Sequence, residues 1–359
     1  MKNVLLLTDV NFWELSSGNR ARIYNLVKYL SAQVRLTVVN TGPAPQGIED
    51  KLSALFGAEF HVLENAKYLS STGYGRRLKA LIKGRHFDAV IIEYIHSSYF
   101  LNFLTEETRL ILDAHDIISE RAEEFKKFDY GGELYELPAA TEQEIFGVYD
   151  HIMVLCPADH EKVTAMAGPG KALLCPHPLQ PVAHPLREQV QNIVFVASAY
   201  LPNRDAINWF IKNCWPQIFD KHQVELQIYG TVCGGVDLDG QQNINLNGFV
   251  NDIDEVYRKA DIVINPVRFG AGLKIKNVEA LAHGLPLVTT THGARGIEAG
   301  LNKAFLVADD ADAFILAIGM LIDDPGKRRS LGENAIHLIK DDFNTEGCFK
   351  PLIEAINSG

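Results

Sequence analysis

The sequence has few of the features that mark disulfide-bonded, zinc-binding or membrane-spanning proteins. Its five cysteines are odd in number, widely spaced and without a Cys-x-x-Cys pair, which predicts a reducing cytoplasm and no structural zinc site. The apolar run Val4–Leu7 is followed by Asp9 and is too short for a signal peptide or a membrane span. We therefore expect a soluble, cytoplasmic protein.

Basic charge and dinucleotide-binding motifs are also scarce. The net charge of −11 argues against binding to nucleic acid. No Gly-x-Gly-x-x-Gly follows the first apolar run, which disfavours an NAD-dependent oxidoreductase. The chain does have 359 residues, 47% of them hydrophobic, which is enough for two domains. Helical and apolar-strand patterns alternate from end to end, as is typical of an α/β protein with parallel sheets covered by helices.

The N-terminal half has the pattern of a Rossmann-like domain. A helix is predicted over residues 19–30, and buried strands are predicted at residues 4–8, 35–39, 89–93, 110–113 and 151–155. Ligands of open parallel sheets gather at the carboxyl ends of the strands, where Gly18, His115 and Asp116 are expected. A plain helix-start turn at Gly18, and a loop histidine with a capping aspartate, are the structural alternatives.

The most informative stretch runs from Arg268 to Glu279 in the C-terminal half. Strands predicted at residues 262–264 and 286–288 enclose a helix and a loop with two glycines, Gly270 and Gly272. Glycines let a ligand approach the backbone closely, and the unpaired amides at a helix start favour an anion. The same stretch contains three cations, Arg268, Lys274 and Lys276.

This combination predicts a pocket for a nucleotide diphosphate. Gly272, Lys276, Glu279 and His283 recur at spacings of three and four residues, so they share one face of the helix. The alternative is an ordinary βαβ crossover, in which Lys276 and an exposed Glu279 form a surface ion pair of small worth.

The stretch resembles the signature of the retaining glycosyltransferases of the GT-B fold, the group called family 4 or group 1. The resemblance implies two Rossmann-like domains whose parallel sheets face each other across a cleft. It implies that Glu279 binds the ribose of a nucleotide sugar. The family pattern has another glutamate where this chain has Ala271. The residues implied to bind the donor diphosphate are Arg268, Gly270, Gly272, Lys274, Lys276 and Gly18.

Other segments extend the resemblance over most of the chain. Residues 193–219 are similar to the first strand and helix of the family's C-terminal domain, in their Pro-Asn, Trp-Phe and Trp-Pro pairs. They depart from it at Ala197 and Ser198, where many members have Gly-Arg.

The resemblance also implies a catalytic role for His115 and Asp116. A histidine of the matching His-Asp pair contacts the transferred sugar in the family. Asp116 or Asp113 would then fix the tautomer of the His115 imidazole.

Repeated prolines at residues 176–185 predict an extended linker between the domains. We therefore place an acceptor-binding domain at residues 1–180 and a nucleotide-sugar-binding domain at residues 181–341. Residues 342–359 are expected to form a helix that crosses back onto the first domain, as is common in the GT-B fold.

Two patterns bear on membranes and metals. The basic segment 74–86 could contact the inner membrane face or an acidic acceptor, or could be a plain solvated helix. The Asp-x-Asp sequences at 237–239 and 252–254 have the spacing of a metal clamp, but the first lies in a glycine-rich loop and the second would cap a helix. We therefore expect no obligatory metal and no cofactor other than the nucleotide sugar as substrate.

The resemblance implies transfer of a sugar from a nucleoside diphosphate donor to a hydroxyl of a glycan or lipid-linked acceptor, with retention of configuration. Such a reaction belongs to polysaccharide biosynthesis. Two rivals stay open. A sugar-nucleotide epimerase or hydrolase would consume donor without an acceptor, and a noncatalytic partner of another transferase would only bind the nucleotide sugar.

Overall fold

The computed structural model describes residues 1–15, 17–63, 71–104, 108–132, 134–182 and 184–358. The chain forms two compact units. The first contains Met1–Ala122, Gly132–His177 and Glu346–Gly359, and the second contains Glu123–Gly131 and Pro178–Thr345. The main boundary thus follows His177 rather than residue 180. The return to the first unit follows Thr345, and the short segment Glu123–Gly131, which the sequence places in the first domain, packs with the second.

The first unit is built on a seven-stranded parallel sheet with the order β3-β2-β1-β4-β5-β6-β7. The edge strands β3 and β7 were not predicted, because four and three residues carry too little apolar pattern. The strands are β1 (Asn3–Thr8), β2 (Arg35–Asn40), β3 (Glu59–Val62), β4 (Ala89–Glu93), β5 (Arg109–Asp113), β6 (His151–Val154) and β7 (Ala172–Leu174).

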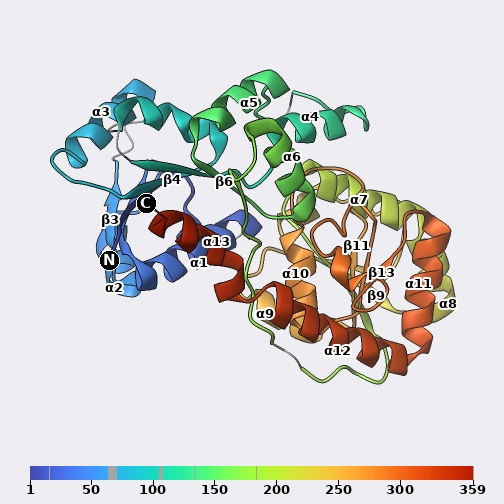
Figure 1. Ribbon diagram of the computed structural model, residues 1–359. Coiled ribbons are helices and arrows are strands. Elements are labelled where there is room, and N and C mark those ends of the chain that lie inside the picture. Colours follow the sequence, from blue (N-terminus) through green and yellow to red (C-terminus); the bar gives the residue numbers. More distant parts are fainter. Residues whose placement is uncertain (16, 64–70, 105–107, 133, 183, 359) are drawn as a thin grey trace. The chain divides into compact units, whose positions relative to one another are not determined.

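Helices cover both faces of this sheet (Figure 1). Alternate β1 side chains face opposite cores: Leu6 packs in one core with Ile23 and Leu352, and Leu7 packs in the other with Leu78. The helices of this unit are η1 (Phe12–Glu14), α1 (Gly18–Gln33), α2 (Ile48–Phe56), α3 (Ser71–Leu81), η2 (Ile95–Phe103), α4 (Ile118–Lys126, whose end belongs to the second unit), α5 (Ala139–Val148), α6 (Pro157–Ala167) and α13 (Thr345–Asn357).

The second unit has a six-stranded parallel sheet with the order β10-β9-β8-β11-β12-β13. Its strands are β8 (Asn192–Val196), β9 (Glu225–Tyr229), β10 (Ile244–Gly248), β11 (Ile262–Asn265), β12 (Leu287–Thr289) and β13 (Leu306–Val307). Its helices are α7 (Leu201–Asn213), α8 (Trp215–His222), η3 (Thr231–Gly235), α9 (Ile253–Lys259), α10 (Ile275–Ala282), η4 (Glu298–Gly300), α11 (Ala311–Asp323) and α12 (Pro325–Asp342).

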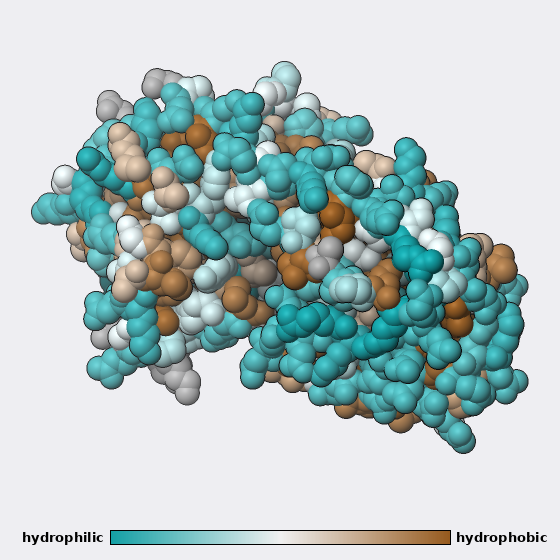
Figure 2. All heavy atoms as spheres, turned by 90° about the horizontal axis from the view of Figure 1, so that it is seen from below, coloured by the Kyte–Doolittle hydropathy of each residue, from teal (hydrophilic) through white to brown (hydrophobic). Residues whose placement is uncertain are grey.

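The helices α7, α8 and α11 cover one face of the second sheet, and α9, α10 and α12 lie on the other (Figure 1). Each unit is therefore a parallel sheet between two helical layers, so the predicted α/β class with two Rossmann-like domains is confirmed. None of the helices in the described part of the chain combines the length and hydrophobicity that a membrane span needs. Figure 2 shows hydrophilic residues over most of the visible face of each unit.

Candidate functional site

The loop from Arg268 to Lys274 leaves the carboxyl end of β11, next to the centre of the second sheet. Gly270 and Gly272 have φ angles of 113° and 69°, a backbone region that residues with a Cβ rarely adopt. The Nζ of Lys274 donates hydrogen bonds to the carbonyls of Ala271 and Gly272, at 3.1 and 2.9 Å. The two glycines are thus required by the shape of the loop, and Lys274 lies against its backbone.

Lys276 lies in the first turn of α10 and is partly buried. Its Nζ donates a hydrogen bond to Oδ1 of Asn203 and lies 5.0 Å from the centroid of the Phe195 ring. Burial and the neighbouring Lys274 lower the pKa of Lys276 to about 7. The amine is therefore a poorly solvated group that a bound anion would stabilise in its charged form.

Glu279 lies one turn after Lys276 on α10. Its Oε2 accepts a hydrogen bond of 2.9 Å from the hydroxyl of Tyr257 on α9, whose ring stacks on His283 at a centroid distance of 4.9 Å. Burial raises the pKa of Glu279, and the hydrogen bond from Tyr257 opposes that shift. The alternative interpretation of Glu279 as part of an exposed ion pair is wrong. The Glu279 carboxylate is partly buried and accepts its hydrogen bond from a fully buried tyrosine.

Arg268 already has a carboxylate partner within the unit. Its Nε and Nη2 donate to Asp205 of α7 at 3.1 and 2.8 Å, and its guanidinium lies 5.4 Å from the rings of Phe128 and Trp209. Arg268 thus holds the loop onto α7. A diphosphate would have to compete with Asp205 for this cation.

The segment Glu123–Gly131 packs on the same loop through aromatic rings. The buried Phe269 contacts Phe125, Phe128 and Tyr130 at centroid distances of 5.2, 4.5 and 5.5 Å. This short segment therefore supports the loop that carries the candidate diphosphate ligands.

In the first unit, His115 follows the carboxyl end of β5 and has a left-handed backbone with a φ of 60°. Its Nε2 lies 2.7 Å from Oε2 of Glu93, the last residue of β4, and 4.0 Å from Oδ2 of Asp113. Asp116 contacts Nη1 of Arg121 instead, at 3.0 Å. The hydrogen-bonded partner of His115 is therefore Glu93, a residue that the sequence interpretation missed, and not Asp116 or Asp113.

Gly18 is the first residue of α1. Next to it, the side-chain amide of Asn19 donates a 2.9 Å hydrogen bond to the hydroxyl of Tyr94. The ring of Tyr94 in turn stacks on His115, at a centroid distance of 4.1 Å and an interplanar angle of 9°. The start of α1 is thus linked through Asn19 and Tyr94 to the candidate catalytic histidine.

Donor atoms of Glu93, Asp113 and His115 lie within 4.8 Å of one another, a spacing that could suit a metal ion. Arg22, however, donates to both carboxylate oxygens of Asp113 at 3.0 Å. A guanidinium in that position opposes a metal cation, so we interpret the cluster as a charge network.

The two Asp-x-Asp sequences have local structural roles. The Asp252 carboxylate caps α9 by accepting from the backbone amides of Asp254 and Glu255, as predicted. The Asp237 carboxylate accepts from the amide of Asp239 in a turn.

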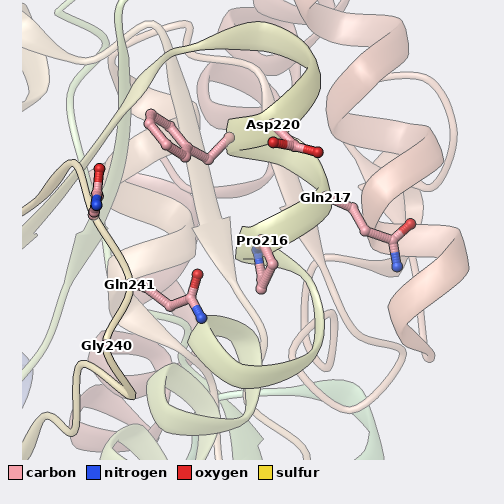
Figure 3. A pocket seen from close by; sticks show the side chains of 7 residues that line it. Pro216, Gln217, Asp220, Gly240 and Gln241 are labelled. Carbon is pink, nitrogen blue, oxygen red and sulfur yellow. The ribbon is translucent and has the colours of Figure 1, made fainter.

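A surface depression in the second unit lies away from these residues (Figure 3). Gln242 precedes β10, so the depression lies at the amino edge of the sheet, opposite the edge at which the Arg268 loop leaves β11. In Figure 3 the polar side chains of Gln217, Asp220 and Gln241 point in different directions rather than toward one another. The residues that line the depression are Pro216, Gln217, Phe219, Asp220, Gly240, Gln241 and Gln242.

The two units have the architecture of GT-B proteins, and solved structures of glycosyltransferases share it over the whole chain. Sucrose-phosphate synthase from Thermosynechococcus elongatus has 14% identity and a TM-score of 0.77, with 99% of this chain and 98% of that chain covered. HepE of Anabaena in complex with UDP-glucose has 14% identity and a TM-score of 0.71, with both chains fully covered. A variant of S. aureus TarM in complex with fondaparinux, alpha-GlcNAc-glycerol and UDP has 11% identity and a TM-score of 0.75, again with full coverage.

The sequence comparisons agree with the fold. Residues 190–324 match the family model described as "Glycosyl transferases group 1". An uncharacterized 44.6 kDa protein in the cps region of Klebsiella pneumoniae is 21% identical over 306 residues, which cover 77% of this chain and 76% of that protein. Residues 190–324 are thus similar to a group 1 glycosyltransferase domain, and the chain as a whole has the GT-B fold.

Proposed function

We propose that the enzyme transfers a hexose from a nucleoside diphosphate sugar to a hydroxyl of a glycan or lipid-linked glycan, with retention of configuration. The observation that carries this proposal is the arrangement on α10 and the loop before it. Two left-handed glycines precede the helix, Lys276 lies in its first turn, and Glu279 follows one turn later. The complexes of HepE with UDP-glucose and of TarM with UDP support a uridine nucleotide as the first donor to test.

The chemistry follows from where charge develops. Cleavage at the anomeric carbon leaves negative charge on the departing diphosphate, which Lys274, Lys276 and the amides at the start of α10 would stabilise. Glu279 would accept hydrogen bonds from the ribose hydroxyls and so orient the donor. In a reaction with retention, the departing phosphate would help to deprotonate the acceptor on the same face of the sugar.

The roles that complete the site come from the other candidate residues. His115 would hydrogen-bond the transferred sugar, and Gly18 would allow close approach of the donor phosphates. Asp116, held by Arg121, would act beside His115. Arg268 would reach the diphosphate only by leaving Asp205. We expect no metal requirement, and unchanged activity in EDTA would support this.

The acceptor belongs, in our proposal, to a cell-surface polysaccharide, since the related Klebsiella pneumoniae protein is described as lying in a cps region. The enzyme would then act in the cytoplasm at the inner membrane face. The exposed side chains of Arg76, Arg77, Lys79 and Lys83 on and after α3 could contact anionic lipid there. Replacing these four with glutamine should then reduce binding to anionic liposomes. Unchanged binding would remove the membrane contact and leave transferase activity as a separate question.

A radiolabelled donor incubated with cell lipid and glycan extracts tests the function. Label in an extracted product supports a transferase. Donor consumption without an acceptor supports the epimerase or hydrolase, and binding without turnover supports the noncatalytic partner.

The donor site itself is tested by thermal stabilisation with UDP, GDP and their sugars. Glu279→Gln should abolish nucleotide-dependent stabilisation. Glu255→Gln, which changes an exposed carboxylate on α9, is the matched control and should keep it. Stabilisation that survives Glu279→Gln would place the nucleotide elsewhere.

A further inference from the structure

Four charged side chains are buried together around the candidate catalytic histidine, at the ends of β4 and β5 and on α1. Their exposed fractions are 7% for His115 and 0% for the other three. Charges so far from water are tolerated only where they compensate one another. The four are Arg22, Glu93, Asp113 and His115.

Arg22 and Asp113 satisfy each other. The guanidinium donates to both Asp113 oxygens at 3.0 Å, and its remaining Nη1 donates to the carbonyls of Cys175 and Pro176 at 2.9 and 3.3 Å. This leaves Glu93 without a permanent cation of its own. Its close partner is the imidazole of His115.

The charge balance places a proton on the Glu93–His115 pair. Two carboxylates and one guanidinium leave one negative charge in excess, and one added proton removes it. Burial and the charge of Asp113 raise the pKa of Glu93 to about 7. Burial by itself lowers the pKa of His115, but Asp113 and Glu93 outweigh it and the pKa is raised. Near neutral pH, the carboxylate and the imidazole therefore share one proton.

The other titratable groups that face this cluster do not compete for that proton. Burial raises the pKa of Tyr94, and it raises the pKa of the Cys175 thiol to about 12. Burial and nearby positive charges lower the pKa of His177 to about 3, and neither of its ring nitrogens has a hydrogen-bond partner among the described residues. Asp116 is paired with Arg121.

The position of the His115 ring is fixed on two sides. Tyr94 and His115 both have positive φ angles, of 64° and 60°, which persist in residues with a Cβ only where the surroundings hold them. Tyr94 covers one face of the imidazole, and Glu93 holds Nε2. The nitrogen left for a substrate is therefore Nδ1.

We propose that Glu93 is the positioning residue of His115: it holds the hydrogen on Nε2, so that Nδ1 is the nitrogen presented to the transferred sugar. This inference rests on the proposed function and adds a residue to its site. When the shared proton is present, both ring nitrogens carry hydrogen and Nδ1 donates to a sugar hydroxyl. When it is lost, the Nε2–H tautomer stays on Glu93 and Nδ1 becomes an acceptor. Turnover therefore falls as pH rises through the titration of the pair.

The first test uses the wild-type enzyme. Heteronuclear NMR of the histidine rings, with His115→Gln to assign the signals, should show titration above the ordinary value of about 6.5 and an Nε2–H tautomer at high pH. An Nδ1–H tautomer, or titration below the ordinary value, overturns the proposal. Loss of the His115 signals with stoichiometric Mn²⁺ would show a metal site and also overturn it.

The second test changes the charge and keeps the hydrogen bond. In Glu93→Gln the amide oxygen still accepts from Nε2, but the negative charge is gone. The His115 titration should fall by about one pH unit or more, and kcat should fall about tenfold while KM for the donor stays within about twofold. Glu93→Asp, which keeps the charge, should recover part of kcat and the wild-type pH profile.

The matched control is Glu59→Gln, which removes the carboxylate at 2.7 Å from the partly exposed His61. It should leave kcat and the His115 signals unchanged. Wild-type kcat together with an unchanged His115 titration in Glu93→Gln would refute the positioning role.

UDP-induced stabilisation, measured on the same proteins, separates this inference from the proposed function. It should be intact in Glu93→Gln, because the candidate diphosphate ligands Lys274 and Lys276 lie in the second unit. A wild-type enzyme that neither binds nucleotide nor transfers sugar would defeat the proposed function. The NMR experiment would still decide the pairing of Glu93 with His115.

Discussion

Lys276 is the cation whose charge a bound diphosphate would change most. Its pKa of about 7 in the free protein means that its amine is only partly protonated at neutral pH. An anion beside Nζ favours the charged form, so nucleotide binding should take up a proton at Lys276 above that pH.

We therefore expect the affinity for UDP to fall as pH rises above about 7, by up to about tenfold per pH unit until the pKa of the bound state is reached. Lys276→Met should weaken UDP binding by about tenfold at low pH and remove this dependence. Calorimetric titrations of the wild type and the variant over the same pH range separate the pH dependence of affinity that is due to Lys276 from the part that is due to ionisation of the nucleotide. Lys259→Met, at an exposed position of α9, is the control. A pH dependence of UDP affinity that persists in Lys276→Met would assign the proton to another group.

The hydroxyl of Tyr257 contacts two acceptors on α10, Oε2 of Glu279 at 2.9 Å and the carbonyl of Lys276 at 3.3 Å. Tyr257→Phe keeps the ring on His283 but removes the hydrogen bond that opposes the raised pKa of Glu279. UDP binding should weaken by about 1.5 to 3 kcal/mol, the usual worth of a hydrogen bond to a charged group. Calorimetry measures the loss. Tyr149→Phe removes a similarly buried hydroxyl, bonded to Ser98 in the first unit, and should not change binding. Equal losses in both variants would mean a general effect on stability.

The sequence indicated residues that could touch a ligand, but not their partners. Glu279 and His115 lie in motifs, whereas Tyr257 and Glu93 come from other elements. Glu93 reaches His115 only because β4 pairs with β5 in a register that sets it opposite Asp113. A carboxylate ending an apolar strand was the one available signal, since a buried charge needs a partner.

At the scale of elements, the hydrophobic pattern located the predicted central strands to within about two residues and placed a helix around Glu279, as expected for strongly periodic segments. The pattern could not predict that the segment Glu123–Gly131 belongs to the second unit. That placement depends on contacts of Phe125 and Phe128 with Phe269, which lies more than a hundred residues later. Long-range aromatic contacts leave no periodic signal.

Phe128→Ala should therefore destabilise the second unit. It removes a ring stacked 4.5 Å from Phe269 and the face over which the Arg268 guanidinium lies. Because Phe128 is only partly buried, we expect a loss of about 1 to 2 kcal/mol, seen as a lower urea midpoint. Tyr135→Ala, at a position that is 49% exposed, should leave the midpoint unchanged. An unchanged midpoint in Phe128→Ala would show that the segment is not part of this folding unit.

At the scale of the whole molecule, the two ends of the chain belong to the same unit, the first. The last helix, α13, completes the core that begins with β1: Phe349, Leu352 and Ile356 pack there with Leu6. The hydroxyl of Tyr29 on α1 also donates a 3.0 Å hydrogen bond to Glu346. A change near the end of the chain should therefore act on the unit formed by its beginning.

Leu352→Ala makes this testable. Leu352 is fully buried, so its truncation should cost about 2 to 5 kcal/mol in the first unit. With two separate cores we expect two unfolding transitions in calorimetry. UDP should raise the midpoint temperature of the transition that belongs to the second unit. The variant should lower the midpoint temperature only of the transition that does not respond to UDP. Met320→Ala, at an exposed position of α11, should move neither. If Leu352→Ala instead lowered the UDP-responsive transition, α13 would unfold with the second unit, and its contacts with α1 and β1 could not be what holds the first unit together.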